Sequence, residues 1–353
     1  MQSIEANLYS IYFNEKGYHR VNEFFIKNNY SSIFILVDEH TNEFCLPKLL
    51  PNLTTEIPIE IIEVEAGEGI KNITTCVEIW SILSDLGADR KSLIINLGGG
   101  VITDIGGFIA STFKRGIDFI NIPTTLLGMV DASIGGKNGV DLGNLKNQIG
   151  VINVPKLLFI DTSFLETLSQ KEMRSGLAEM LKHGLIYDKN YWNKFLDLKK
   201  LNFDDLDQLI YRSVEIKNEI VKQDPTENGI RKALNFGHTL GHAIESHFLE
   251  SNTPLLHGEA IAIGMVLESY ISKEMGLLSN EEYNQIKYNI TTLYDKHIFN
   301  ESDVKSIQNL MIHDKKNEYG KVQFSLLNGI GKTLINQQVD NWLIINSFED
   351  YKN

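Results

Sequence analysis

A row of polar residues along one predicted helix carries the strongest chemical signal in this sequence. Arg231, Asn235, His238, His242 and Glu245 follow one another at spacings of 4, 3, 4 and 3 residues. At about 100° per residue, these positions fall within an arc of roughly 80° on a single helix. Solvent-exposed helix faces usually carry Lys and Glu. A face of His, Asn and Arg therefore indicates a polar site in the interior.

Several of these side chains are of the kinds that bind metal ions. His238 and His242, four residues apart, can reach one zinc ion from a single helix face. Thr239 stands where the HExxH motif has its general-base Glu, so a zinc protease is not expected. Glu179, on a second helical segment, and His257, at the start of a third, are further candidates. Two His and one carboxylate would leave a coordination position for a substrate hydroxyl. The residues alone leave open which of them are ligands.

A glycine-rich turn, residues 97–104, follows a predicted strand and opens a predicted helix. Backbone amides at such a helix start bind a pyrophosphate, because glycine lets the ligand approach the main chain. Gly98 and Gly100 match the GxGxxG fingerprint, whereas Thr103 replaces its third glycine. The turn indicates dinucleotide binding, and a tight turn without a ligand is the alternative.

A second segment, residues 131–138, presents Lys137 beside two glycines. A P-loop would need Gly at 131 and Ser or Thr at 138, but Asp131 and Asn138 stand there, which excludes an NTPase of that type. Lysines beside glycine-rich backbone suit a phosphate or carboxylate ligand. Solvated loop lysines are the alternative.

The elements that must position these residues change in character along the chain. Short apolar runs predict strands at 32–37, 59–64, 92–97, 119–122 and 157–160, with helices between them at 73–86 and 101–112. This alternation predicts a parallel α/β sheet that binds ligands at the carboxyl ends of its strands. Helical periodicity then dominates in residues 172–187, 206–222, 231–249 and 258–275. We therefore expect an α/β fold with two domains: a Rossmann-like parallel-sheet domain over 1–165 and an all-α domain over 166–353.

Composition narrows the classes of function. The chain has 353 residues and a net charge of −13, so a nucleic-acid partner is not expected. Its most apolar stretch, residues 92–110, is broken by Asn96, Asp104 and five glycines and does not resemble a membrane span. The N-terminal residues do not resemble a signal peptide. The two cysteines form no CxxC pair, and we expect a cytoplasmic protein.

Taken together, the motifs resemble those of the 3-dehydroquinate synthases, within the sugar-phosphate cyclase superfamily. The matching segments are Gly98–Asp104, Phe113–Gly116, Ile122–Leu127, Val130–Lys137, Leu234–Ala243 and Leu256–Ala260. The resemblance runs from about Asp38 to about Gly331, nearly the whole chain. Thr103 and Asn138 depart from it, where many relatives have Gly and Thr.

The resemblance assigns NAD binding to the domain over 1–165, and metal and substrate binding to the domain over 166–353. It also implies a role for each of a set of residues. Zinc, with cobalt as a possible substitute, would be held by Glu179, His238 and His257. NAD would be bound by Asp38, Gly67, Glu68, Lys71, Gly99, Gly100, Val101, Asp104, Thr124, Thr125, Lys137, Lys146, Phe164 and Thr167. The catalytic residues would be Arg115, Asp131, Lys137, Lys182 and His242. The substrate would also meet Lys146, Asn147, Lys217, Glu227, Arg231, Asn235 and one of Lys315 and Lys316, of which we favour Lys316.

The implied reaction is that of a lyase in the shikimate pathway of aromatic amino-acid biosynthesis. It converts 3-deoxy-D-arabino-heptulosonate 7-phosphate to 3-dehydroquinate and phosphate by transient NAD-dependent oxidation, phosphate elimination, reduction and intramolecular aldol closure. The resemblance also implies a homodimer. The alternatives are a sister cyclase such as a 2-deoxy-scyllo-inosose synthase, a metal-dependent NAD polyol dehydrogenase, and a dinucleotide-binding module without activity.

Overall fold

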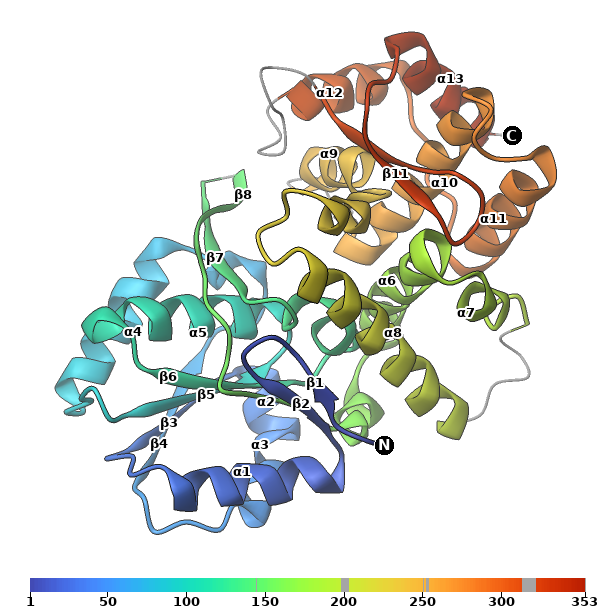
Figure 1. Cartoon of the computed structure of the whole chain (residues 1–353). Coiled ribbons are helices and arrows are strands. Elements are labelled where there is room, and N and C mark those ends of the chain that lie inside the picture. Colours follow the sequence, from blue (N-terminus) through green and yellow to red (C-terminus); the bar gives the residue numbers. More distant parts are fainter. Residues whose placement is uncertain (144, 198–202, 250, 252–253, 313–321, 353) are drawn as a thin grey trace. The chain divides into compact units, whose positions relative to one another are not determined.

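The computed structural model describes all residues except 144, 198–202, 250, 252–253, 313–321 and 353. Contacts between Cα atoms divide the chain into two compact units, Met1–Ser169 and Gln170–Asn353. The first contains a largely parallel sheet with helices and the second is mainly helical (Figure 1). The predicted α/β fold with a helical C-terminal part is confirmed.

A seven-stranded sheet forms the centre of the first unit, in the order β1-β2-β9-β6-β5-β3-β4. Its strands are β1 (Ile4–Glu5), β2 (Ser10–Phe13), β3 (Ile33–Asp38), β4 (Ile59–Val64), β5 (Leu93–Gly98), β6 (Asp118–Pro123) and β9 (Leu157–Ile160). All neighbouring strands run parallel except β1 and β2. The five predicted strands correspond to β3, β4, β5, β6 and β9.

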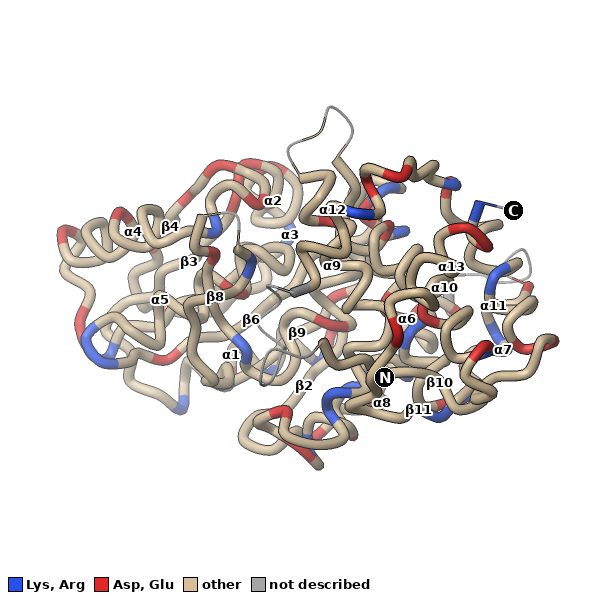
Figure 2. The backbone as a smooth tube through the Cα atoms, turned by 90° about the horizontal axis from the view of Figure 1, so that it is seen from above, with Lys and Arg blue, Asp and Glu red and all other residues tan. Residues whose placement is uncertain are grey.

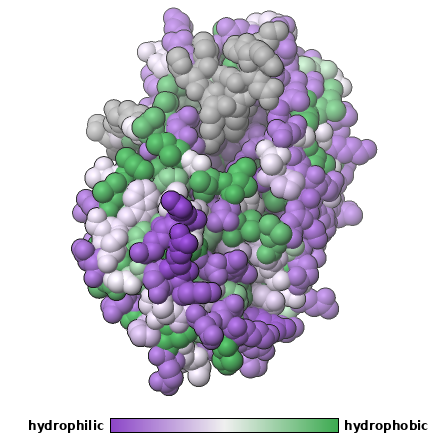
Figure 3. Space-filling model, turned by 60° about the vertical axis from the view of Figure 1, so that its left-hand side comes forward, coloured by the Kyte–Doolittle hydropathy of each residue, from purple (hydrophilic) through white to green (hydrophobic). Residues whose placement is uncertain are grey.

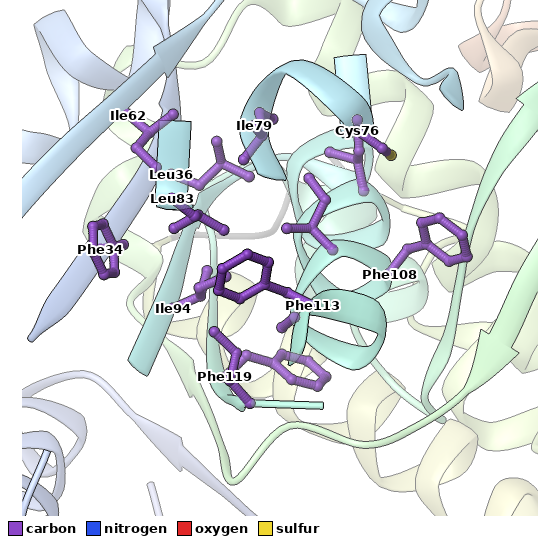
Figure 4. Close-up of a cluster of buried hydrophobic side chains, with 14 of the residues drawn as sticks. Phe34, Leu36, Ile62, Cys76, Ile79, Leu83, Ile94, Phe108, Phe113 and Phe119 are labelled. Atoms are coloured by element: carbon purple, nitrogen blue, oxygen red, sulfur yellow. The ribbon is translucent and has the colours of Figure 1, made fainter. Parts of the chain in front are cut away.

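Helices cover both faces of this sheet (Figure 1). The helices of the unit are α1 (Glu15–Lys27), α2 (Glu39–Phe44), α3 (Leu46–Leu49), α4 (Ile73–Asp85) and α5 (Gly100–Thr112). Coverage on both faces explains why β5 is buried at every position, and apolar at most of them, rather than alternating. Figure 4 shows the core on one face, where Phe34, Ile94 and Phe119 from the strands pack against Ile79 and Leu83 of α4.

A hairpin that the sequence did not predict follows β6. Its strands are β7 (Lys137–Leu142) and β8 (Leu145–Ile152), which pair antiparallel. Gly139 and Gly150 lie opposite each other, and a Cβ on either would come within 2.6 Å of a backbone oxygen of the partner strand. Glycine usually disfavours strands, so the sequence pattern hid a hairpin in which close backbone contact requires glycine.

The second unit is built around α10, which is buried along most of its length. Its helices are α6 (Gln170–Tyr187), α7 (Lys189–Asn193), α8 (Phe203–Gln223), α9 (His238–Phe248), α10 (His257–Glu274), α11 (Asn280–Leu293), α12 (Glu301–Ile312) and α13 (Asn341–Lys352). Helices α6, α9, α11 and α13 contact α10. A hairpin of β10 (Phe324–Leu327) and β11 (Thr333–Gln337) accompanies the helices.

One predicted helix is wrong. Residues 231–249 do not form a single helix: Ile230–Asn235 form a 3₁₀ turn, and α9 begins only at His238. Gly237, between them, has a φ of 77° in the left-handed region, which interrupts the helical path. Arg231 and Asn235 therefore do not share a helix face with His238, and the polar row consists of two separate segments.

Charged residues of both signs are distributed along the whole described chain, without a separate basic region. Figure 2 shows Lys and Arg scattered among Asp and Glu along the described chain. On the face seen in Figure 3, apolar side chains are interspersed with polar ones. Among the described helices, the structure has none with both the length and the apolar character needed to span a bilayer.

Candidate active site

Three histidines from two helices come together in the second unit. His238 and His242 lie on α9, and His257 is the first residue of α10. Each offers a ring nitrogen, and these three atoms lie within 4.8 Å of one another. The ring centroids are 5.1–5.7 Å apart. The helices thus bring His257 beside the α9 pair from a separate part of the chain.

A buried carboxylate from α6 faces two of these histidines. Oε1 of Glu179 lies 3.4 Å from Nε2 of His238 and 3.6 Å from Nε2 of His257. Ligands bound tetrahedrally to zinc at about 2.0–2.1 Å stand about 3.3–3.4 Å apart. The two distances from the carboxylate oxygen to the imidazole nitrogens are close to this value and fit a divalent transition metal such as zinc or cobalt.

The other ring nitrogen of each of these two histidines is also held. Nδ1 of His238 lies 3.1 Å from the carbonyl oxygen of Phe236, and Nδ1 of His257 lies 3.1 Å from Oε2 of Glu245. A carbonyl oxygen only accepts, so Nδ1 of His238 carries the proton of this bond. Hydrogen bonds of this kind orient metal-binding imidazoles and fix their tautomer. Glu245 belongs to the polar row of the sequence, where no role could be predicted for it. The structure shows that it is the hydrogen-bond partner of His257.

The electrostatics of the cluster favour a cation. Burial alone would lower the pKa of His257, but the carboxylates of Glu245 and Glu179 outweigh it and raise that pKa to about 9. Lys182, three residues after Glu179 on α6, forms a buried ion pair with the other carboxylate oxygen. The carboxylates of Glu179 and Glu245 therefore stabilise positive charge next to the histidines, and the Lys182 ammonium balances part of their negative charge.

Three predicted substrate residues lie in the segment just before α9. Nδ2 of Asn235 donates to Oε1 of Glu227 at 2.8 Å, and the buried Arg231 donates to the carbonyl of Pro225 at 2.6 Å. Asp224, which no sequence motif indicated, organises this loop. Its carboxylate accepts hydrogen bonds from three backbone amides, those of Asn228, Gly229 and Arg231. A buried Lys217 lies on α8, and Lys316 falls outside the described residues.

In the first unit, the glycine-rich turn joins β5 to α5. Gly99 is the N-cap of α5 and Gly100 its first residue. A Cβ on Gly99 would lie 2.9 Å from Cγ2 of Thr125, so this position has no room for a side chain without a shift of its neighbour. The amide of Thr124 donates to the carbonyl of Gly98 at 3.0 Å. The predicted residues Gly99, Gly100, Thr124 and Thr125 therefore meet at the carboxyl ends of β5 and β6, where a helix N-terminus suits a pyrophosphate.

Other predicted NAD residues are linked by ion pairs. Nζ of Lys71 lies 2.7 Å from Oδ2 of Asp104, and Nζ of Lys146 lies 3.5 Å from Oε1 of Glu68. Burial acts to lower the pKa of Lys71, but the carboxylates of Asp104 and Glu68 outweigh it and raise that pKa. Asp38, by contrast, caps α2 by accepting from the amide of Thr41.

The remaining predicted residues of this unit lie in short irregular segments. Arg115 is exposed, with a φ of 71°, and Asp131 lies in a π-helical turn at Gly128–Ala132. Lys137 opens β7 with an exposed side chain, and the backbone amide of Asn147, on β8, donates to Asp141. A 3₁₀ turn, Thr162–Thr167, carries Phe164, which is buried, and Thr167.

Comparison with known proteins identifies the family. Models of the N-terminal and C-terminal parts of 3-dehydroquinate synthase match residues 61–175 and 176–317. A curated 3-dehydroquinate synthase of Parabacteroides distasonis is 44% identical over 332 residues, 94% of each chain. The chain belongs to the 3-dehydroquinate synthase family. The resemblance seen in the sequence motifs is thereby confirmed, as is the expectation of a lyase of this kind.

Solved structures agree with a fold of this family. A 2-deoxy-scyllo-inosose synthase, complexed with carbaglucose-6-phosphate, NAD⁺ and Co²⁺, superposes with a TM-score of 0.86 at 25% identity over 99% of this chain and all of that one. A probable glycerol dehydrogenase from Sinorhizobium meliloti has a TM-score of 0.67 at 9% identity, over 99% of this chain and 98% of that one, and so shows a shared fold alone.

The two departures from the family pattern have local structural roles here. The buried hydroxyl of Thr103 donates to the carbonyl of Gly100 at 3.1 Å, inside the first turn of α5. Asn138 donates from Nδ2 to the carbonyls of Gly136 and Asn153, at 3.1 and 2.6 Å, and so holds the base of the β7–β8 hairpin. Both side chains are satisfied within the first unit.

Proposed function

We propose that this chain converts 3-deoxy-D-arabino-heptulosonate 7-phosphate to 3-dehydroquinate and phosphate. The observation that carries the proposal is the arrangement of Glu179, His238 and His257 as a three-donor metal site in a member of this family. The close match to the Parabacteroides distasonis synthase over nearly its full length supports the same substrate.

The metal would be held by Glu179, His238 and His257. When bound, it would supply Lewis-acid chemistry that lowers the pKa of a substrate hydroxyl. Zinc is the ion we propose, and the Co²⁺ in the 2-deoxy-scyllo-inosose synthase complex makes cobalt a useful substitute. The hydrogen bonds from Nδ1 to Glu245 and to the Phe236 carbonyl would hold the two imidazoles in orientation for this ion.

NAD would be bound by the first unit. Its pyrophosphate would meet the amides at the start of α5, contributed by Gly99, Gly100 and Val101. The other residues we assign to it are Asp38, Gly67, Glu68, Lys71, Asp104, Thr124, Thr125, Lys137, Lys146, Phe164 and Thr167. When bound, NAD would supply a transient hydride acceptor.

The substrate carries a carboxylate and a phosphate, and the chain provides cations for both. Arg231 suits the carboxylate because guanidinium pairs with it in a planar, bidentate way, whereas lysines suit phosphate as point charges. We assign substrate contacts to Lys146, Asn147, Lys217, Glu227, Arg231, Asn235 and Lys316. His242, whose ring lies beside those of His238 and His257, would move a proton at the substrate. Arg115, Asp131, Lys137 and Lys182 complete the catalytic set that we assign.

The test follows phosphate and NADH together. Purified protein with zinc, catalytic NAD and 3-deoxy-D-arabino-heptulosonate 7-phosphate should release phosphate without net NADH, and a chelator should stop it. NADH accumulation without phosphate release would instead indicate a polyol dehydrogenase.

One specific observation favours a second candidate: the 25%-identical neighbour is a cyclase complexed with an analogue of a sugar 6-phosphate. Glucose 6-phosphate and sedoheptulose 7-phosphate, tested in parallel, distinguish the sister cyclases.

We also propose a cytoplasmic homodimer. The two cysteines, Cys45 and Cys76, are buried and unbonded, which suits a reducing compartment. The dimer rests on the family resemblance. Sedimentation velocity on the purified chain should give a mass of twice 40.0 kDa, and a monomer at micromolar concentration would reject it.

A further inference from the structure

Helix α9, which carries His238, begins without a capping side chain of its own. Its N-cap is Gly237, in the left-handed region at φ 77°. A Cβ there would lie 2.5 Å from Cγ of Met265 and 3.1 Å from the Met265 backbone nitrogen. The Ser, Thr, Asp and Asn side chains that usually cap helices therefore do not fit at this position.

A buried carboxylate from the neighbouring helix supplies the missing acceptors. Glu268, fully buried on α10, accepts from the amide of Gly237 through Oε2 at 2.6 Å and from the amide of Leu240 through Oε1 at 3.1 Å. These are the N-cap and N3 amides. In a capping box two side chains of the same helix divide these bonds between them. Here one carboxylate from another helix makes both, next to the positive end of the helix dipole.

Helices α9 and α10 approach closely enough for this contact because glycines lie where their backbones meet. A Cβ on Gly264 of α10 would lie 2.0 Å from the carbonyl oxygen of Gly237. A Cβ on Gly241 of α9 would lie 2.8 Å from Cδ1 of Ile261. The start of α9 is therefore packed directly on the backbone of α10, the helix that also carries His257.

We propose that Glu268 is a positioning residue for His238. By capping α9 from the neighbouring helix α10, the Glu268 carboxylate keeps the His238 imidazole directed toward Glu179. His238 lies between the two capped amides, and its Nδ1 is tied to the carbonyl of Phe236. With the backbone fixed on both sides, Nε2 points to Oε1 of Glu179 at 3.4 Å. The inference rests on the proposed metal site, because it assigns Glu268 the task of keeping one ligand of that site in place.

The first test measures metal affinity. Glu268→Gln keeps the shape of the side chain but turns one acceptor into an NH₂ group facing an amide. Competition with a chromophoric chelator should show Co²⁺ binding weakened by about 10- to 100-fold, with a changed visible spectrum of the bound cobalt. Ser269→Ala is the matched control: Ser269 is buried on the same helix, and its hydroxyl has no hydrogen-bond partner among the described residues. It should leave affinity and spectrum unchanged.

The second test does not depend on metal. Hydrogen exchange of a peptide covering 237–248, in metal-free protein, should be faster in Glu268→Gln than in the wild type or Ser269→Ala. Unchanged cobalt affinity and exchange in Glu268→Gln would overturn the inference, as would an equal loss in Ser269→Ala. If the wild-type protein binds no cobalt, the proposed function fails, and the exchange comparison alone decides whether Glu268 holds the start of α9.

Discussion

The two units build their candidate sites by opposite means. In the first, the turn at Gly98–Gly100 presents backbone amides, and the function that we propose for it depends on side chains being absent. In the second, Glu179 and the histidines present side chains, and the function that we propose for them depends on a buried carboxylate and imidazole nitrogens held close together. A backbone site should therefore be sensitive to one added methyl group, and a side-chain site to the loss of one charge or one nitrogen.

The sharpest test of the second unit's site replaces its histidines one at a time. His238→Ala should reduce bound zinc from one ion per chain to none, because its Nε2 faces Glu179 and its Nδ1 is already held. His242→Ala should keep the zinc and lower turnover by roughly 10²- to 10⁴-fold, the usual range for an acid–base residue. Metal analysis of both purified variants measures this. Equal zinc in the two would refute our choice of ligands.

A buried ion pair in the first unit tests whether that unit also depends on charge. Asp104→Asn should lower the free energy of unfolding by about 3 kcal/mol, because it leaves the buried Lys71 ammonium without its 2.7 Å partner. Urea unfolding measures the change. The double variant Lys71→Met/Asp104→Leu should recover most of the stability. If Asp104→Asn alone were neutral, the first unit would not depend on this pair.

The backbone site is tested by adding one methyl group. Gly99→Ala should weaken NAD binding by about 10-fold, because the new Cβ would lie 2.9 Å from Thr125 and must displace it. Calorimetric titration with NAD measures the change, and zinc content should not alter. Gly276→Ala is the control: it has open space around it and a φ of 72°, so it should cost about 1 kcal/mol of stability and leave NAD binding intact. Equal NAD affinity in wild type and Gly99→Ala would contradict the assignment.

The smallest effect concerns the loop before α9. Partial burial acts to raise the pKa of Asp224, but the amides of Gly229, Asn228 and Arg231 outweigh it and lower that pKa. The carboxylate therefore contributes stability at neutral pH. That contribution begins to decrease below the ordinary Asp value of about 3.9 and is lost as the pH falls through the lower pKa of the folded state. Asp224→Asn should cost about 1 kcal/mol at pH 7, and this cost should shrink steadily as the pH is lowered below that ordinary value. A difference that persists at low pH would mean that the charge is not what holds the loop.

Local patterns in the sequence determined much of this molecule. The buried strands β3, β5 and β9 and the helices α4, α5 and α6 follow from apolar runs and from helical periodicity. The glycine-rich turn at Gly98–Gly100 and the His-bearing motifs lie in short segments, so their chemistry and the family resemblance are legible without a fold. These features depend on residues a few positions apart, and that is the range over which sequence patterns carry information.

Only the tertiary structure decided how the second site is assembled. Glu179 is 59 positions before His238, and packing of α6 and α9 on α10 brings the two to 3.4 Å. The break at Gly237 and the cap from Glu268 depend on contact between the backbones of two helices, which no periodicity within one helix reports. The candidate donor residues could be recognised from short segments of the sequence. Their approach to one another depends on packing between helices that are far apart in the chain.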